Sequence, residues 1–408
     1  MPTPAAQPER LRPFEHTQRP TSWVVQRVLK RPLAPTEQEY HSLRTGLTQG
    51  DELMDAFVAA ARQRGEVRYY WQQLNGITLG RITQTDIPEL QALLHSAAHP
   101  PFAVDEALCE QAVQFIHRQG RMATDVLRDL SLMAGYLLSA FNQTLILTGD
   151  LDKGAASRLA NTSDWWLKVT DPQSNRSFAP GFLASLQVRW IHAMVREQVQ
   201  QHPQWNGQRY GLPVNQVDMA ATYFGFSLVM LLGLRRFGVW VSPSDSRAVM
   251  HLWKCIAWHM GVQERWLVDT ELQAVVQLRH FMFTQTPPDE TTRQLAGALA
   301  TEPLLRRFSS LPTLRQRWYY WMHLSSTSWL LFGSGKFRQL GLKSPFGPWL
   351  KPLQLLPRLV RYYLHSAWAS ARHRQALYGR AQQVQAVAEL HRNPAEVKQA
   401  MHPVNAGQ

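Results

Sequence analysis

The chain has 408 residues, of which 45% are hydrophobic and 15 are tryptophan, a composition that excludes a disordered or fibrous protein. Its length allows one large core or two or three domains. A total of 43 Lys and Arg against 30 Asp and Glu gives a net charge of +13. Residues 305–380 hold many of these cations and no Asp or Glu. This segment suits an acidic partner, either nucleic acid or an anionic membrane, or forms a solvated cationic surface.

The two cysteines, Cys109 and Cys255, predict neither a disulfide framework nor a cysteine-based metal site. Residues 1–30 are rich in Pro, Arg and Gln and have no long apolar run, unlike a secretory signal. The longest uncharged apolar stretch, residues 219–234, is shorter than the roughly 20 residues that a bilayer requires. We therefore expect a soluble, cytoplasmic protein.

Helical patterns follow one another along most of the chain. Thr36 and Glu39 have the spacing of a capping box that opens a short helix. Apolar residues spaced by three and four predict the longer helices. These cover residues 51–64, 86–97, 105–118, 124–148, 155–169, 183–201, 216–237, 244–260 and 262–283. The pattern predicts an all-α fold.

Two local features qualify this pattern. Asn215 is the expected N-cap of the helix over residues 216–237, which is apolar nearly all round and is therefore expected in the core. Residues 67–72 and 77–82 alternate around Asn75-Gly76 and allow one β-hairpin.

Pro287 and Pro288 lie in a segment, residues 282–290, that suits a boundary. It divides a helical core over residues 86–285 from a basic helical extension over residues 286–408, and residues 1–85 form an N-terminal extension. Within the C-terminal extension, residues 348–378 mix leucines with arginines, as an interfacial membrane helix does. Pro352 and Pro357 predict that an unbroken helix begins there only near Pro357.

Three groups of polar residues are candidates for chemistry. His192 lies among apolar residues on a predicted helix, where a neutral imidazole could bind a metal or haem iron. Arg158 and Thr162 share a helix face, with Asn161 beside them. Asn215 and Asp218 head the most apolar helix. Each group has a structural alternative, namely a buried hydrogen-bonded histidine, an exposed helical turn and a helix cap.

Other catalytic motifs are absent from the sequence. Gly333-Ser334-Gly335-Lys336 lacks the first glycine and the Ser/Thr of a phosphate loop. The chain contains no Glu-x-x-His pair, no His-Glu-x-x-His and no Gly-x-Ser-x-Gly, so di-iron, zinc-protease and α/β-hydrolase sites are not predicted.

A series of short motifs over residues 90–285 resembles the family of the oxygenase MpaB and the bacterial rubber oxygenase, latex clearing protein. In chain order they are Ser131-Leu132, Tyr136, Thr148-Gly149, Arg158-Leu159-x-x-Thr162, Asp171-Pro172, Val188-Arg189-x-x-His192-Ala193-x-x-Arg196, Trp205, Gly211-x-Pro213-x-Asn215-Gln216-x-Asp218, Phe226, Trp253 and Gly261-Val262. No single motif is strong, but their common order and spacing carry the resemblance.

The resemblance implies a b-type haem in a globin-like helical core, with dioxygen bound at the open face and a carbon–carbon double bond cleaved. His192 is then the proximal iron ligand, and Arg158 and Thr162 lie on the distal side. We assign His192, Arg158, Arg196, Asn215 and Asp218 to cofactor binding. Arg158, Asn161 and Thr162 are assigned to catalysis.

Two positions depart from the rubber-cleaving members that the chain resembles. Those proteins have a lysine immediately before the distal threonine, where this chain has Asn161. Their glutamate base falls near Asn142, and no carboxylate stands between Asp129 and Asp150. We therefore expect an unsaturated hydrophobic small molecule, isoprenoid- or lipid-like, in place of polyisoprene.

Two other functions stay open. The first is a haem protein that binds or senses a gas or a lipid without turnover. The second is a helical module that docks on a membrane surface through residues 348–378. A nucleic-acid partner is not expected, because the basic stretch contains no recognisable motif.

Overall fold

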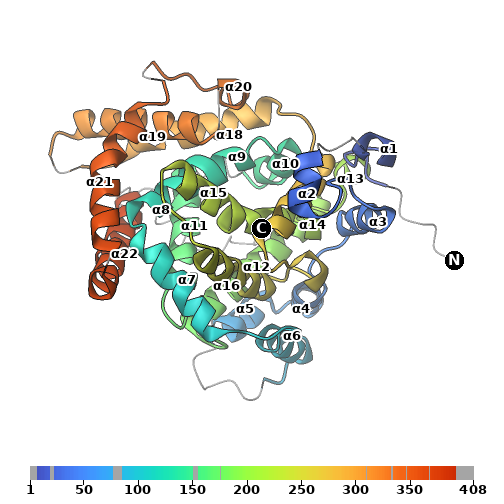
Figure 1. Cartoon of the computed structure of the whole chain (residues 1–408). Coiled ribbons are helices and arrows are strands. Elements are labelled where there is room, and N and C mark those ends of the chain that lie inside the picture. Colours follow the sequence, from blue (N-terminus) through green and yellow to red (C-terminus); the bar gives the residue numbers. More distant parts are fainter. Residues whose placement is uncertain are drawn as a thin grey trace. The chain divides into compact units, whose positions relative to one another are not determined.

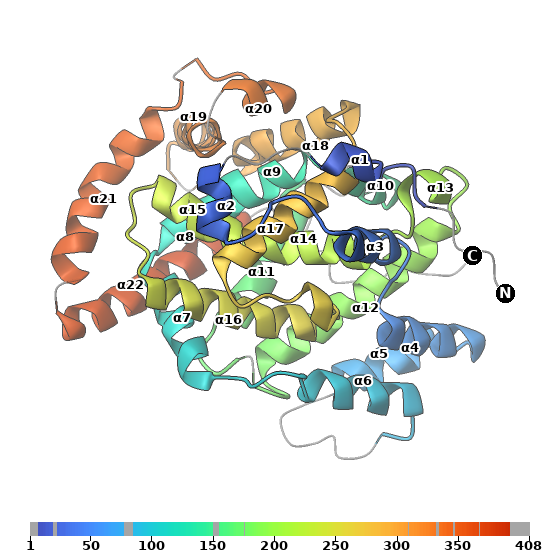
Figure 2. The ribbon, with the colours of Figure 1, turned by 45° about the vertical axis from the view of Figure 1, so that its right-hand side comes forward.

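A computed structural model of the chain describes residues 7–18, 23–76, 85–149, 155–174, 176–308, 310–331, 334–345, 347–366 and 368–391. It is 73% helical and has no strand among these residues, so the predicted all-α class is confirmed (Figure 1, Figure 2). The capping box at Thr36 and the N-cap at Asn215 are both formed.

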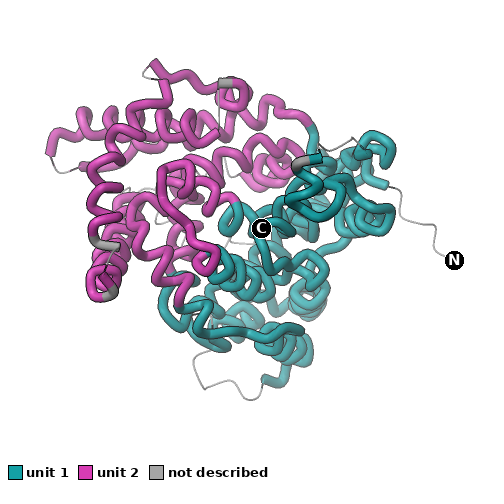
Figure 3. Tube along the Cα trace, viewed as in Figure 1, with its two compact units in different colours: residues 1–110, 168–228, 246–286 teal, residues 111–167, 229–245, 287–408 magenta. Residues whose placement is uncertain are grey.

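The chain forms two compact units, each built from three segments (Figure 3). Unit 1 comprises residues 1–110, 168–228 and 246–286, and unit 2 comprises residues 111–167, 229–245 and 287–408. Each unit thus combines separate parts of the chain. The division into residues 1–85, 86–285 and 286–408 stays a prediction.

Unit 1 contains the first six helices of the chain together with helices from residues 180–210, 216–226 and 264–284. They are α1 (Phe14–Thr17), α2 (Trp23–Leu29), α3 (Glu37–Gly46), α4 (Glu52–Gln63), α5 (Val67–Asn75), α6 (Pro88–Ala98), α12 (Pro180–Gln200), α13 (Gly207–Tyr210), α14 (Gln216–Phe226), η2 (Glu264–Trp266), α17 (Glu271–Phe281) and η3 (Met282–Thr284). Four further helices contribute residues to both units: α7 (Glu106–Arg118), α11 (Ala155–Val169), α15 (Leu228–Arg236) and α16 (Pro243–His259).

Unit 2 contains the middle helices and the C-terminal region. They are α8 (Arg121–Val126), η1 (Leu127–Leu132), α9 (Met133–Gly135), α10 (Ser139–Leu147), α18 (Glu290–Thr301), η4 (Glu302–Leu305), α19 (Pro312–Leu330), α20 (Ser334–Gln339), α21 (Leu350–Ser366) and α22 (Ala369–Leu390). α19 packs on α18, α20 and α21, and α21 also packs on α22.

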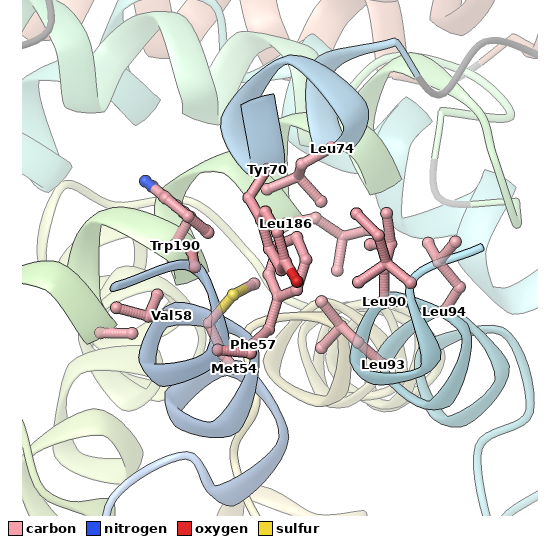
Figure 4. Packing of buried hydrophobic residues seen from close by; sticks show 14 of the residues in the cluster. Met54, Phe57, Val58, Tyr70, Leu74, Leu90, Leu93, Leu94, Leu186 and Trp190 are labelled. Carbon is pink, nitrogen blue, oxygen red and sulfur yellow. The ribbon is translucent and has the colours of Figure 1, made fainter. Parts of the chain in front are cut away.

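An apolar cluster in unit 1 joins α4, α5, α6 and α12 (Figure 4). Phe57, Tyr70 and Trp190 stack edge to face or tilted in it, with ring centroids 5.2 Å apart for each pair that includes Phe57. The predicted strand over residues 67–72 is wrong, because these residues begin α5. Tyr70 and Leu74, four residues apart, are both fully buried, and this helical spacing outweighs the local alternation. Residues 77–82 lie outside the described residues.

The predicted helix over residues 124–148 is interrupted. α8 continues into η1, a π-helical turn, and then into α9, which ends at Gly135. α10 follows at a bend of 96°. The predicted helix over residues 216–237 is likewise divided, because the backbone leaves helical geometry at Ser227 between α14 and α15.

The C-terminal helix α21 begins at Leu350, earlier than the two prolines predict, and contains Pro357. A proline cannot donate to the carbonyl four residues before it, here that of Leu353. Leu353 and Pro357 are both exposed, so water can satisfy this carbonyl.

Among the described residues, α14 and α15 taken as one stretch, Gln216–Arg236, are long and apolar enough to cross a membrane, and 67% of the most apolar window is buried inside the protein. The bent pair Arg121–Gly135 and Ser139–Leu147 meets the same criterion when taken together. Core helices of soluble proteins also meet this criterion, so it does not by itself indicate a membrane span.

Candidate functional site

Helix α12 carries His192 and is fixed to the core of unit 1. It begins with Pro180 in its first turn, a position where a proline needs no hydrogen-bond partner. Phe182, Leu186 and Trp190 lie on one face and pack into the apolar cluster. His192 follows two residues after Trp190, so its side chain leaves the helix on another face.

Four short side chains form part of the face of α12 that carries His192. Residues seven and four before it and three and seven after it share this face. They are Ser185, Val188, Val195 and Val199, of which the first and last are buried. His192 itself is half-buried. Arg189 and Arg196, three residues before and four after His192, share this face, and their guanidinium groups bind Asp51 and Asp55.

Two arginines of α12 are bound to carboxylates of unit 1. The Arg189 guanidinium binds Asp51 through two nitrogens, one of them at 2.7 Å from Oδ1. Gly261 has φ +84°, and a Cβ there would collide with this ion pair. Arg196 binds Asp55 and donates to the carbonyl of Val214 at 3.0 Å. Arg196, predicted to bind the cofactor, therefore has protein partners.

Asn215 and Asp218 are also joined to the protein and to each other. Asn215 caps α14 by accepting the Asp218 N–H, and its amide donates to Asp218 Oδ2 at 2.8 Å. Arg10 holds the same carboxylate with two bonds of 2.8 and 3.2 Å. Asn215 and Asp218 thus form the buried helix cap that was their structural alternative.

Helix α11 carries the predicted distal residues, in the part that belongs to unit 2. Arg158 and Thr162 are half-buried, whereas Asn161 is exposed. The guanidinium of Arg158 lies 5.7 Å from the ring centre of Tyr136. Its Nη1 is buried and has no hydrogen-bond partner among the described residues. Burying a cationic donor without a partner costs free energy, so this position favours the binding of a hydrogen-bond acceptor.

Asn142 lies in α10 of the same unit and is fully buried. Its amide donates to the backbone carbonyl of Tyr136 at 2.8 Å and to Thr292 Oγ1 at 3.4 Å. Its Oδ1 has no partner among the described residues. Asn142 thus fixes the chain at the bend that carries Tyr136, under Arg158.

A buried charge cluster in unit 2 was not predicted from the sequence. It consists of Asp125, Arg128, Asp129, Glu302, Arg306, His323 and Lys351. Lys351 binds Asp125 at 2.6 Å, and His323 Nδ1 lies 2.9 and 3.0 Å from the two oxygens of Asp129. Its members come from η1, η4, α19 and α21 and from the end of α8, so sequence spacing could not indicate it.

Contacts with neighbouring side chains offset the effect of burial on the pKa of the carboxylates in this cluster. Burial would raise the pKa of Glu302, but Arg306 and Arg128 outweigh it and hold the pKa at about 2. Burial likewise opposes ionisation of Asp129, yet His323 and Arg128 lower its pKa to about 2. Asp129 and Glu302 are therefore ionised and paired with arginine side chains, which favours a structural role for the cluster.

A second cluster bears on the expectation that no cysteine-based metal site is available, because it brings three potential ligands together. Cys109, His251 and Cys255 come together in unit 1, although 146 residues separate the two cysteines. The four-residue spacing of His251 and Cys255 on α16 was visible in the sequence. The approach of Cys109 depends on tertiary packing and was not.

The predicted site residues therefore fall into two groups. His192, Arg196, Asn215 and Asp218 belong to unit 1, and Arg158, Asn161 and Thr162 belong to unit 2. Within unit 1 the structure joins Asn215 to Asp218. Within unit 2 it places the three α11 residues within about one turn of the same helix.

Comparison with known proteins gives three findings. Residues 117–392 match the family described as "ER-bound oxygenase mpaB/B'/Rubber oxygenase, catalytic domain". The rubber oxygenase of Streptomyces sp. (strain K30) is 25% identical over 281 residues, which are 64% of this chain and 67% of that protein. The solved structure of latex clearing protein LCP in the closed state has the same fold, with a TM-score of 0.66 and 18% identity over 83% of this chain and 91% of that one.

Proposed function

Because the chain belongs to the family of ER-bound oxygenase mpaB/B' and rubber oxygenase catalytic domains, we propose that it is a haem-b-dependent oxygenase of an unsaturated hydrophobic molecule. The family match confirms the predicted resemblance and makes this protein an oxygenase enzyme. The haem, its ligand and an isoprenoid- or lipid-like substrate are the proposed part.

The observation that carries the haem proposal is the position of His192. A neutral imidazole offers one ring nitrogen that would hold haem iron. The flat ring system of a haem requires that no long side chain occupies the space next to that imidazole. Ser185, Val188, Val195 and Val199 are short, and Arg189 and Arg196, which share the face, are bound to Asp51 and Asp55. The residues present therefore fit the group, and His192 would hold it.

The bound haem would supply the redox chemistry with dioxygen. Arg158 would contribute a positive charge and the unpaired Nη1 donor where negative charge develops. Thr162, on the same helix face, would donate its hydroxyl. Arg196, Asn215 and Asp218 would act as positioning residues, because their polar groups bind the protein itself.

Asn142 limits how the substrate is processed. Its side-chain amide cannot accept a proton as a carboxylate base does, and its N–H groups already serve Tyr136 and Thr292. We therefore propose a product route that needs no base at this position. Asn161, which is exposed, would contribute to catalysis least of the three α11 residues.

Absorption spectroscopy of the purified chain tests the haem proposal. The wild type should show a Soret band and a haem content near one per chain, and His192→Ala should lose it. His95→Ala, an exposed histidine on α6, is the matched control and should keep it. A folded wild type without haem, even after reconstitution, would refute the proposal.

Oxygen consumption distinguishes the oxygenase from a non-catalytic haem protein that senses a gas or lipid. Terpenoids and unsaturated lipids should stimulate oxygen uptake by the haem-loaded chain. Arg158→Gln should lower turnover about 100-fold at unchanged haem content, since it removes one charge-stabilising donor. Dioxygen binding without any uptake across these substrates would favour the sensor.

A second proposed property is docking of α21 on an anionic membrane surface. Six large apolar side chains, spaced by three, four and one residues, are between 45% and 67% exposed on it and just before it. They are Trp349, Leu353, Leu356, Val360, Tyr363 and Leu364. Lys351, Leu355 and Tyr362 form the opposite, buried face, and α21 packs there between α19 and α22 (Figure 2).

The charge beside this stripe indicates the kind of surface. Arg358 and Arg361 are exposed on α21, and residues 303–388 contain no Asp or Glu. An apolar stripe flanked by cations is the pattern of an interfacial helix on anionic lipid. Flotation with phosphatidylcholine liposomes should improve when phosphatidylglycerol is added. Leu353→Ser with Val360→Ser should abolish it, whereas Leu377→Ser on α22 should not.

A further inference from the structure

Three potential metal ligands meet in unit 1, and none of them is among the residues proposed to serve the haem. Cys109 lies in the first turns of α7, and His251 and Cys255 lie one turn apart on α16. Their ligand atoms are all within 4.8 Å of one another. Neither cysteine forms a disulfide, and Cys255 is buried while Cys109 is half-buried.

The separations approach those of a tetrahedral metal site. Zinc binds sulfur at about 2.3 Å and nitrogen at about 2.0–2.1 Å, so its ligand atoms lie about 3.5–3.8 Å apart. His251 Nε2 is 3.8 Å from Cys255 Sγ. A contraction of no more than about 1 Å therefore completes the three-ligand set.

The nitrogen of His251 that faces the thiols carries a lone pair. Nε2 accepts the backbone N–H of Asp105 at 2.9 Å, which places the ring hydrogen on Nδ1. Asp105 also caps α7 through its carboxylate, which accepts the N–H groups of Ala107 and Leu108. Asp105 is exposed, so water can take over its N–H when an ion takes the lone pair.

We propose that Cys109, His251 and Cys255 bind one zinc ion, with water in the fourth position. Both thiols would lose a proton on binding, so two thiolates neutralise the two charges of the ion. Soft thiolates select zinc over magnesium or calcium. The imidazole favours a metal over a disulfide, because a disulfide makes no use of it.

An ion can reach the site from solvent, and the three side chains leave one coordination position for water. Cys109 and His251 are half-buried and Cys255 is buried, so an ion can arrive from the side of Cys109 and His251. Three protein ligands and one water are also the arrangement of zinc sites that keep an exchangeable position. The proposal does not depend on the haem, because none of its ligands serves that group.

Zinc titration of the untagged full-length chain, reduced and stripped with a chelator, tests the proposal by calorimetry. We expect one site per chain, with proton release detected as a dependence of the heat on the buffer. Cys109→Ser and Cys255→Ser should abolish the site, and His251→Gln should weaken it more than tenfold. His95→Gln, an exposed histidine of the same unit, should leave the affinity unchanged.

X-ray absorption at the zinc edge needs no variant and keeps the test valid if Cys255→Ser fails to fold. The wild type should show two sulfur ligands and one nitrogen ligand among light scatterers. Absence of a saturable site, or a zinc shell without sulfur, would overturn the proposal. So would a chain whose two cysteines form a disulfide and which regains no zinc site after reduction.

Discussion

The two units bury charge in different ways. Unit 1 uses separate ion pairs, each joining a distant segment to one helix: Asp51 with Arg189 and Asp218 with Arg10. Unit 2 gathers its charges into the single cluster that contains Asp125, Asp129 and Glu302. In unit 1, Asp51 and Asp218 each pair with a different arginine. In unit 2 Arg128 binds two carboxylates, and Asp129 contacts both Arg128 and His323.

This difference determines how strongly the stability cost of one substitution should depend on the other charged residues. Breaking a buried pair leaves one uncompensated charge, which is costly wherever it occurs. In unit 1 the cost should stay with that pair, because the pairs share no partner. In unit 2 the remaining members can rearrange, so the cost should depend on which other members are present.

The largest effect is expected at the centre of the unit 2 cluster. Asp129→Asn removes the charge that Arg128 and His323 both contact, and Asp129 is fully buried. The free energy of unfolding should fall by about 3–5 kcal/mol. Urea unfolding followed by circular dichroism measures it.

Glu290→Gln is the control in the same unit. Glu290 pairs with Arg293 at the surface, where their side chains are 63% and 52% exposed. Its removal should change the free energy of unfolding by less than about 0.5 kcal/mol. A similar loss in both variants would contradict the special cost of the buried cluster.

The second effect concerns acid and a buried histidine of unit 1. Burial, and then the charge of Arg189, lower the pKa of His259 from 6.5 to about 4. Between these values the unfolded chain binds a proton that the folded chain refuses. Stability is therefore fully present above about pH 6.5 and is lost as the pH falls toward 4, by about 3 kcal/mol.

His259→Gln should remove this loss, measured as the difference in unfolding free energy between about pH 7 and about pH 4.5. The exposed His95→Gln should keep it. Burial and the charge of Arg128 also lower the pKa of His323 in unit 2, although the carboxylate of Asp129 opposes them. An unchanged pH dependence in His259→Gln would show that unit 1 does not depend on a neutral histidine.

The smallest effect tests the comparison itself through double-mutant cycles. Asp125→Asn and Asp129→Asn should be non-additive by about 1 kcal/mol, since both carboxylates interact with His323. Asp51→Asn and Asp218→Asn should add within about 0.5 kcal/mol, because each pairs with its own arginine. Equal coupling energies in the two cycles would remove the distinction between separate pairs and a cluster.

Local patterns predicted most helices but not where they break. The caps at Thr36 and Asn215 follow from side chains within three residues of the helix start, so the sequence contains them. The divisions at Ser227 and after Gly135 depend on packing around α14 and α10. Neither place contains a proline, so the apolar periodicity continues across both and predicts unbroken helices.

The candidate site was predictable where a motif is local. His192 and the Arg158–Thr162 spacing each lie within one helix, and the family match supports the resemblance on which their roles rest. The partners of Arg196 and Asp218 were not predictable, because Asp55 and Arg10 are remote in sequence. The same holds for Cys109 beside Cys255.

The π-helical turn η1 has a consequence for how related chains align. Its hydrogen bonds run from residue i to i+5, so it holds one residue more than an α-helical turn. Deleting one residue there would restore α-helical geometry and leave the helix that follows facing as before, because the wider turn absorbs one extra residue without rotating what comes after it. We expect relatives that are one residue shorter in this region to have an unbroken α-helix at η1 and to keep the same residues facing the core on either side of it.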